Sequence, residues 1–337
     1  MSRLSFPVLS LAISLALSGC GAEFSHPDTA GHEVHLLVRP FYKDLFAHSD
    51  EPLAQLTSRM QSDYPGYFDS YCQFEIRVGL PGSDSYDVAM PRFLAYDANS
   101  DVLPVCDSVF ASIDISDELS DAFSCFATLF PQQPVPSQVL CHFSGFNDKM
   151  FVDSSFISFS IEHYLGESCP FYDMLEIPVY ARRTRQSRFI VSDLVKAWVY
   201  STLPDPACND DVLSALSYQG RVLYAVHSCI PSISLADLFG FSDEQLRWCQ
   251  VNEGRMWAYL AEHKLLYTTN MLDRNKIVNE APFTSFFGNQ SPGRAAIFCA
   301  YQMVCSFMKR NPSTSLPQLM AISDSQKILV GANYNPK

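Results

Sequence analysis

Residues 188–231 read RFIVSDLVKAWVYSTLPDPACNDDVLSALSYQGRVLYAVHSCIP, and this stretch decides the fold because it predicts two consecutive amphipathic helices. Ser192 is the predicted N-cap of the first helix, in which apolar residues recur with a period of 3.6. These apolar residues are Val191, Leu194, Val195, Trp198, Val199 and Leu203. Pro204 and Pro206 end the helix, because proline lacks the backbone N–H that a helix interior requires.

The second helix carries a glycine on its buried face. Asn209 or Asp210 is its predicted cap, and Gly220 lies in its apolar stripe. A glycine inside a helix costs about 1 kcal/mol relative to alanine. We therefore expect Gly220 to permit the close approach of another backbone.

The two helices have the layout of a zinc peptidase active site without its ligands. Gluzincin-type peptidases carry HExxH on one helix and a glutamate on the next, which supplies three ligands and a general base. Here no histidine occurs between His163 and His227, and Gln219 occupies the position expected for the glutamate. Neutral Gln219 cannot replace a carboxylate, and Asp193 alone cannot hold zinc. The pattern indicates either two plain core helices or an inactive scaffold, with no catalytic residue, no metal and no cofactor.

Composition and charge limit the class of protein. The chain has 337 residues, of which 47% are hydrophobic and 13% aromatic, so it can bury one sizeable core or two modest ones. Its formal net charge is −13. A chain this acidic is not expected to bind nucleic acid, and anionic lipid surfaces repel it.

The N-terminus predicts export and lipid attachment. Arg3 precedes an apolar run over residues 9–17, followed by Leu-Ser-Gly-Cys at 17–20. This tetrapeptide resembles the bacterial lipobox, which implies a signal peptide over residues 1–19 and acylation of Cys20, for example with palmitate. Residues 20–31 then form a tether, and no later stretch is apolar enough to span a bilayer. Gly21 is not the aspartate that retains some lipoproteins at the inner membrane, so we expect the outer membrane, facing the periplasm.

Ten further cysteines form no CxxC pair, although export would permit disulfides. Many of them stand among apolar residues, so we expect them to be mainly small buried hydrophobic residues.

The remaining patterns predict a mainly helical α+β fold. Residues 139–143 and 156–161 read as two strands, expected to pair as a small antiparallel sheet packed on the helical, zincin-like half. Ser242 and Gln245 form a predicted capping box at the start of a long helix. We expect a single domain over residues 32–337, with a mixed helical part at 32–136 and the zincin-like part at 137–337.

That long helix places Glu253 on its predicted buried face, where a carboxylate requires a partner or a raised pKa. The predicted partner is Arg294, which follows Ser291 as helix cap and Pro292 as first helical residue. Glu253 and Arg294 either line a binding cleft, or form a structural ion pair, or face the solvent.

A series of motifs then appears in a specific order. It comprises the lipobox, SGFN at 144–147, YLG at 164–166, YQGRVLY at 218–224, NE at 252–253 between Trp248 and Trp257, LYTT at 266–269, APF at 281–283, SPGR at 291–294 and NYNPK at 333–337. The chain thereby resembles the gliding motility lipoprotein GldB family of Bacteroidetes, over nearly its whole mature length. The resemblance implies a relation to predicted zinc-dependent proteases and a role in gliding motility and its associated secretion machinery.

Three functions follow as expectations. The first is a non-enzymatic, lipid-anchored envelope protein that holds a protein partner through a cleft containing Gln219, Glu253 or Arg294. The second is a zinc-dependent hydrolase with dispersed ligands, which would be His142, His227, Cys229 and Glu253. The third is a periplasmic binding domain stapled by disulfides.

Overall fold

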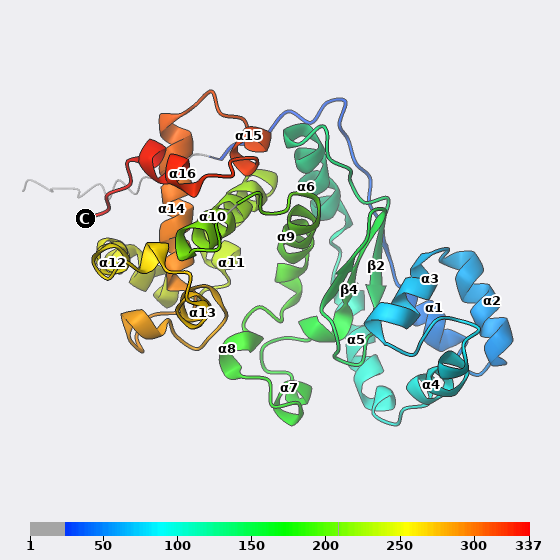
Figure 1. Ribbon diagram of the computed structural model, residues 1–337. Helices are drawn as coiled ribbons and strands as arrows, with labels where there is room; N and C mark the ends of the chain where they lie inside the picture. The colour runs from blue at the N-terminus through cyan, green and yellow to red at the C-terminus, as the bar shows by residue number, and fades with distance from the viewer. Residues whose placement is uncertain (1–23, 208) are drawn as a thin grey trace, which may run out of the picture.

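The computed structural model describes residues 24–207 and 209–337, where helices surround one small sheet (Figure 1). The strands are β1 (Val38–Arg39), β2 (Gln138–His142), β3 (Met150–Val152) and β4 (Phe156–Ser160). The first helices are α1 (Phe41–Ala47), α2 (Leu53–Asp63), α3 (Tyr67–Ser70), α4 (Asp84–Leu94), α5 (Asn99–Ser112) and α6 (Ser116–Leu129). Those after the sheet are α7 (Pro170–Met174), α8 (Val179–Arg182), α9 (Ile190–Thr202), α10 (Val212–Cys229), α11 (Leu235–Phe239), α12 (Asp243–Glu262), α13 (Met271–Val278), α14 (Ala295–Arg310), α15 (Leu316–Met320) and α16 (Ser325–Ala332). The mainly helical α+β class is confirmed.

The sheet is mixed, with strand order β1-β2-β4-β3. β2 and β4 are neighbours but pair in parallel, so the predicted antiparallel pairing of these two segments is wrong. β4 instead forms its antiparallel pair with β3, which precedes it in the chain. No clear sequence signal marks β3, because this strand has only three residues and all of them are partly exposed. Once β3 runs back along the sheet, β4 must run in the same direction as β2.

Two cores lie on opposite faces of the sheet, since successive side chains of a strand alternate between its faces. Val139 and Cys141 of β2 pack into a large core with α6, α9, α10, α12 and α14. Leu140 between them packs into a smaller, aromatic core with α1 to α4. Figure 1 shows this arrangement, with α1 to α4 on one side of β2 and β4 and α6, α9, α10, α12 and α14 on the other.

The helix pair of residues 188–231 forms the centre of the large core. Gly220 of α10 lies against α14, where an added Cβ would be 2.6 Å from the carbonyl oxygen of Ala300. The expected close approach of another backbone is thus confirmed. Because glycine has no side chain, the backbones of α10 and α14 can approach each other closely at Gly220 and Ala300.

Replacing Gly220 by alanine is expected to lower the free energy of unfolding by about 2 kcal/mol, because the overlap outweighs the better helix propensity of alanine. Chemical denaturation followed by circular dichroism measures this change. Equal stability of Gly220→Ala and the unsubstituted protein would contradict the packing argument.

The helix caps follow the sequence in part. The capping box of Ser242 and Gln245 is present at the start of α12. The other predicted caps are wrong: α9 begins at Ile190, before Ser192, and Asp211 caps α10 by accepting a hydrogen bond from the Ser214 amide at 2.8 Å. The cap thus lies one residue after Asp210, and both predicted caps, Asn209 and Asp210, precede the helix.

Buried polar groups gather where β2 and β4 end. The Glu162 carboxylate accepts hydrogen bonds from the Ser144 amide and hydroxyl, both at 2.7 Å, and from the Phe146 amide at 3.0 Å. His142 Nε2 lies 3.2 Å from a carboxylate oxygen of Glu75. These bonds hold the loop after β2 against the sheet.

His163 is a second buried histidine in this region. Arg185 donates to its Nδ1 at 2.5 Å, so the ring accepts as a neutral imidazole. Burial, followed by the charge of Arg185, lowers the pKa of His163 from 6.5 to about 3. Between about pH 3 and pH 6.5, His163 is therefore neutral in the folded protein and protonated in the unfolded chain.

This depressed pKa predicts a pH dependence of stability. The contribution of His163 is complete above pH 6.5 and is lost as the pH falls toward 3, because only the unfolded state takes up the proton. Between pH 7 and 5 the loss should be about 2 kcal/mol. Urea unfolding at both pH values measures it, and His163→Gln should show a correspondingly smaller loss. An unchanged pH dependence in this variant would contradict the assignment.

The cysteines of residues 24–207 and 209–337 are free and buried. They are Cys72, Cys106, Cys125, Cys141, Cys169, Cys229, Cys249, Cys299 and Cys305. Within this part of the chain no disulfide staples the fold, and the thiols pack as small apolar groups. None of the described helices has the length and apolar character needed to cross a bilayer.

Candidate binding cleft

A polar cleft lies between α9, α10 and the start of α14. It is lined by Lys196 and Tyr200 of α9, Gln219 of α10 and Arg294 before α14, and it encloses about 40 Å³. Lys196 and Tyr200 are four residues apart, so both point from the same face of α9. The Tyr200 hydroxyl donates to the Gln219 side-chain oxygen at 2.5 Å. The side chains on the two helices thus engage one another across the cleft.

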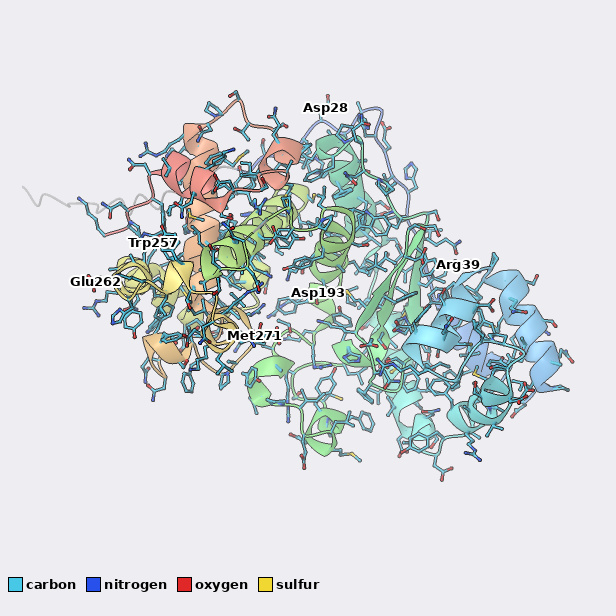
Figure 2. All side chains as sticks on the ribbon, viewed as in Figure 1. Asp28, Arg39, Asp193, Trp257, Glu262 and Met271 are labelled. Carbon is cyan, nitrogen blue, oxygen red and sulfur yellow. The ribbon has the colours of Figure 1, made fainter. Side chains whose placement is uncertain are left out.

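Asp193 anchors the charges beside the cleft, and Figure 2 shows it in the middle of the molecule. It accepts a hydrogen bond from Lys149 Nζ at 2.6 Å and one from the Tyr164 hydroxyl at 3.2 Å, and Lys196 Nζ lies 3.7 Å away. Burial alone would raise the pKa of Asp193, but the ammonium groups of Lys149 and Lys196 outweigh burial and hold this pKa below its ordinary value. Burial lowers the pKa of Lys196, against the opposing effect of Asp193. One carboxylate therefore faces two ammonium groups.

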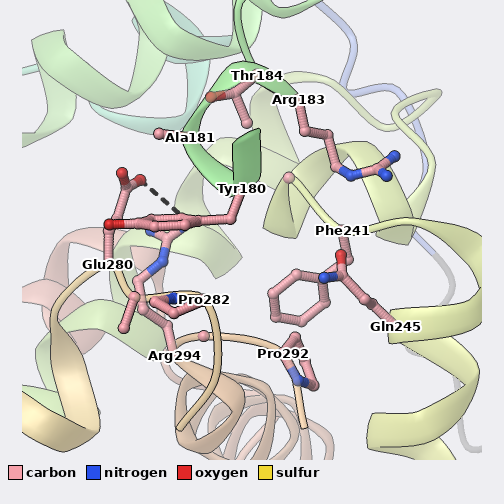
Figure 3. A pocket seen from close by; sticks show the side chains of 13 residues that line it. Tyr180, Ala181, Arg183, Thr184, Phe241, Gln245, Glu280, Pro282, Pro292 and Arg294 are labelled. Atoms are coloured by element: carbon pink, nitrogen blue, oxygen red, sulfur yellow. Dashed lines mark ion pairs between the residues drawn. The ribbon is translucent and has the colours of Figure 1, made fainter. Parts of the chain in front are cut away.

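Arg294 connects this cleft to an adjoining cavity, also of about 40 Å³, lined by Tyr180, Arg183 and Glu280 among others. Its guanidinium lies 3.5 Å from a carboxylate oxygen of Glu280 (Figure 3). Figure 3 also shows Arg183 at the other side of this cavity, away from the ion pair. The two cavities share Arg294 and Phe241. From here on, the name polar cleft refers to the two cavities together.

The predicted ion pair between Arg294 and Glu253 is wrong. Glu253 accepts a hydrogen bond from the Tyr334 hydroxyl at 2.6 Å, and burial raises the pKa of Glu253. Arg294 itself has a left-handed backbone (φ 58°) as the residue before α14, and the Ser291 hydroxyl bonds to the carbonyl groups of Thr284 and Gly288. Ser291 thus closes a loop and does not cap the helix. Of the predicted cleft residues, Gln219 and Arg294 line the same cleft, whereas Glu253 does not line it and bonds to Tyr334.

The chemistry of the cleft residues does not suit a zinc site. HExxH places two histidines four residues apart on one helix. Lys196 and Tyr200 have the same separation on α9, as do any two helical residues four apart, and Gln219 lies across the cleft from them. An ammonium and a neutral amide are poor ligands for zinc. Across residues 24–207 and 209–337, no group of three His, Cys, Asp or Glu side chains is placed to hold a metal ion.

The dispersed ligand set is likewise not assembled. His142 lies beside Glu75, whereas His227 accepts from or donates to the Tyr301 hydroxyl at 2.5 Å and stacks on Phe24. Cys229 is buried in the large core, and Glu253 pairs with Tyr334. These side chains serve different parts of the fold.

Sequence reasoning missed Lys196, Tyr200, Lys149 and Glu280. Lys196 and Tyr200 lie on the first predicted helix, but no pattern of residues singled them out. Lys149 bonds to Asp193 and Glu280 pairs with Arg294, both from distant segments of the chain, so neither had a sequence signal. The predicted lipidation site Cys20 lies outside the described residues.

A protein-family model with the description "gliding motility protein GldB" matches residues 23–336 of this chain. No curated protein and no solved structure matches the chain.

Proposed function

Because the chain belongs to the family of the gliding motility protein GldB, we propose that it is a lipid-anchored component of the gliding machinery that binds a protein partner and catalyses no reaction. The observation that carries the non-enzymatic role is the pairing of Tyr200 with Gln219. We propose that these two groups occupy the positions where a zinc peptidase would present ligands, and that the scaffold is a degenerate zincin whose shape and charge are retained for binding.

The charge of the cleft indicates the kind of partner. Lys196, Arg183 and Arg294 line it, and Glu280 is its acidic lining residue. Lys149 and Asp193, beside Lys196, neutralise each other in an ion pair. This local excess of positive charge stands out in a chain of net charge −13. A local cationic surface attracts anionic groups and orients them. We infer that the cleft receives an acidic side chain or a terminal carboxylate of an envelope protein.

Substituting both cations tests the partner role. In cells that carry an affinity-tagged protein, Lys196→Ala combined with Arg294→Gln should reduce recovery of envelope partners at least tenfold, because both bonds to the carboxylate are lost. Arg247→Gln, at an exposed position of α12, is the matched control and should recover partners normally. Equal recovery by both proteins, with equal thermal stability, would refute the cleft as the binding site. Stoichiometric zinc in the purified protein, or peptide cleavage by it, would refute the non-enzymatic role.

The lipid anchor is tested separately. Cys20→Ser should move the protein from the membrane fraction to the soluble periplasmic fraction and abolish its labelling by palmitate. We propose the periplasmic face of the outer membrane as its location, and separation of inner and outer membranes measures this. Retention of the variant in the membrane fraction would show that another contact holds it.

A further inference from the structure

A second and larger cavity, of about 500 Å³, lies at the loop that follows β2. Helices α4, α5 and α7 form its walls, with Phe93, Val102 and Phe171, and the loop contributes Phe143 and Phe146. Its size lies within the range of small-molecule sites, which are mostly apolar with a few polar groups. It shares no lining residue with the polar cleft.

The rim of this cavity exposes large apolar side chains. Tyr96, Met174 and Leu175 line it, with 65%, 78% and 48% of their surfaces exposed. Apolar side chains clustered around a hollow mark a binding site more often than scattered ones do. Methionine and leucine can adapt to a flexible apolar ligand.

The polar groups of the cavity differ between its rim and its floor. Arg92 is exposed and lines the cavity, and it takes part in none of the ion pairs found among residues 24–207 and 209–337. On the floor, the amides of Ser144 and Phe146 already donate to Glu162. The side chain of Asn99 donates to the Phe93 carbonyl at 2.7 Å. The floor therefore offers an extended peptide few free backbone donors, whereas the rim offers one cation.

We propose that this cavity binds the acyl chain of an anionic amphiphile, with Arg92 at the anionic head group. The apolar walls take the chain, and the guanidinium pairs with a carboxylate or phosphate. Phe24, the first described residue, stacks on His227 of α10 with ring centroids 3.8 Å apart, and α10 contributes no residue to this cavity. In Figure 1 the cavity-forming helices α4, α5 and α7 lie far below the start of the coloured chain. The occupant that we propose is a separate molecule, either a free fatty acid or a lysophospholipid.

Binding is measured by displacement of a dansyl-labelled undecanoic acid from the purified protein. We expect saturable binding, displaced by palmitate or by lysophosphatidic acid, and the more effective of the two identifies the source of the chain. Ala98→Trp fills the cavity from an exposed position of its wall and should weaken binding at least tenfold. Arg92→Gln should weaken the acids about threefold and leave hexadecanol unaffected, as expected for one exposed ion pair.

Arg247→Gln again serves as the control for loss of an exposed arginine and should bind like the unsubstituted protein. Absence of saturable binding, or binding that Ala98→Trp leaves unchanged, would overturn the proposal. Equal affinity for hexadecanol and palmitate would overturn the role of Arg92. Partner recovery through the polar cleft is measured in a different experiment, so either proposal can fail alone.

Discussion

Arg221→Met is expected to lower the free energy of unfolding by about 4 kcal/mol, because it removes a buried cation whose partners remain in the core. Arg221 lies in α10 with 0% of its surface exposed. Its Nη1 donates to the carbonyl oxygens of Met320 and Ile322, both at 2.9 Å, and its Nη2 to Asp205 at 3.2 Å. One guanidinium thus caps the end of α15 and ties it to α10.

Denaturant unfolding followed by circular dichroism measures this loss. Arg221→Lys should be intermediate, because a lysine ammonium keeps the charge but cannot reach all three acceptors with the planar fork of arginine. Arg247→Met, an exposed change of the same chemistry on α12, should alter stability by less than about 0.5 kcal/mol. If Arg221→Met cost no more than this control, the capping role would be excluded.

Glu162→Ala should destabilise the protein by a similar amount, about 4 kcal/mol, since three donors lose their acceptor in a buried site. The donors are the Ser144 amide, the Ser144 hydroxyl and the Phe146 amide. Glu162→Gln should cost about 1–2 kcal/mol, because its amide oxygen still accepts part of these bonds. Thermal and denaturant unfolding of both variants measure the difference.

The control for this pair is Glu262→Ala at the exposed end of α12, which should be neutral or slightly stabilising because it removes a negative charge from a helix C-terminus. Glu162 also holds the loop that forms the floor of the larger cavity. Glu162→Ala should therefore weaken amphiphile binding as well as stability. A stable variant with an unchanged cavity would show that the loop keeps its conformation without the carboxylate.

Local signals in the sequence predicted local structure well. The capping box at Ser242 and the helices α9 and α10 follow from residues within one or two turns of each other. Gly220 was informative for the same reason, since a glycine in an otherwise apolar helix face indicates a neighbouring backbone. The mainly helical α+β class rests on such periodic segments.

The candidate site was predicted only in part. Gln219 and Arg294 were singled out from the sequence, and they line one cleft. Their pairing partners are Tyr200 and Glu280, which the pattern did not indicate. The predicted partner of Glu253 was wrong because Tyr334, which bonds to it, is 81 residues away in the chain. A hydrogen bond over such a separation has no periodicity that a sequence displays.

By itself the sequence determined the long amphipathic helices α9, α10 and α12, the glycine that must meet another backbone, and the absence of any histidine between His163 and His227, because each depends on residue type and short-range spacing. Only the tertiary structure decided the direction of β4, the separation of Glu253 from Arg294, and the meeting of Lys196, Tyr200 and Gln219. The physical reason is that strand pairing and side-chain contacts between distant segments are set by how the whole chain packs, and many arrangements share the same local pattern.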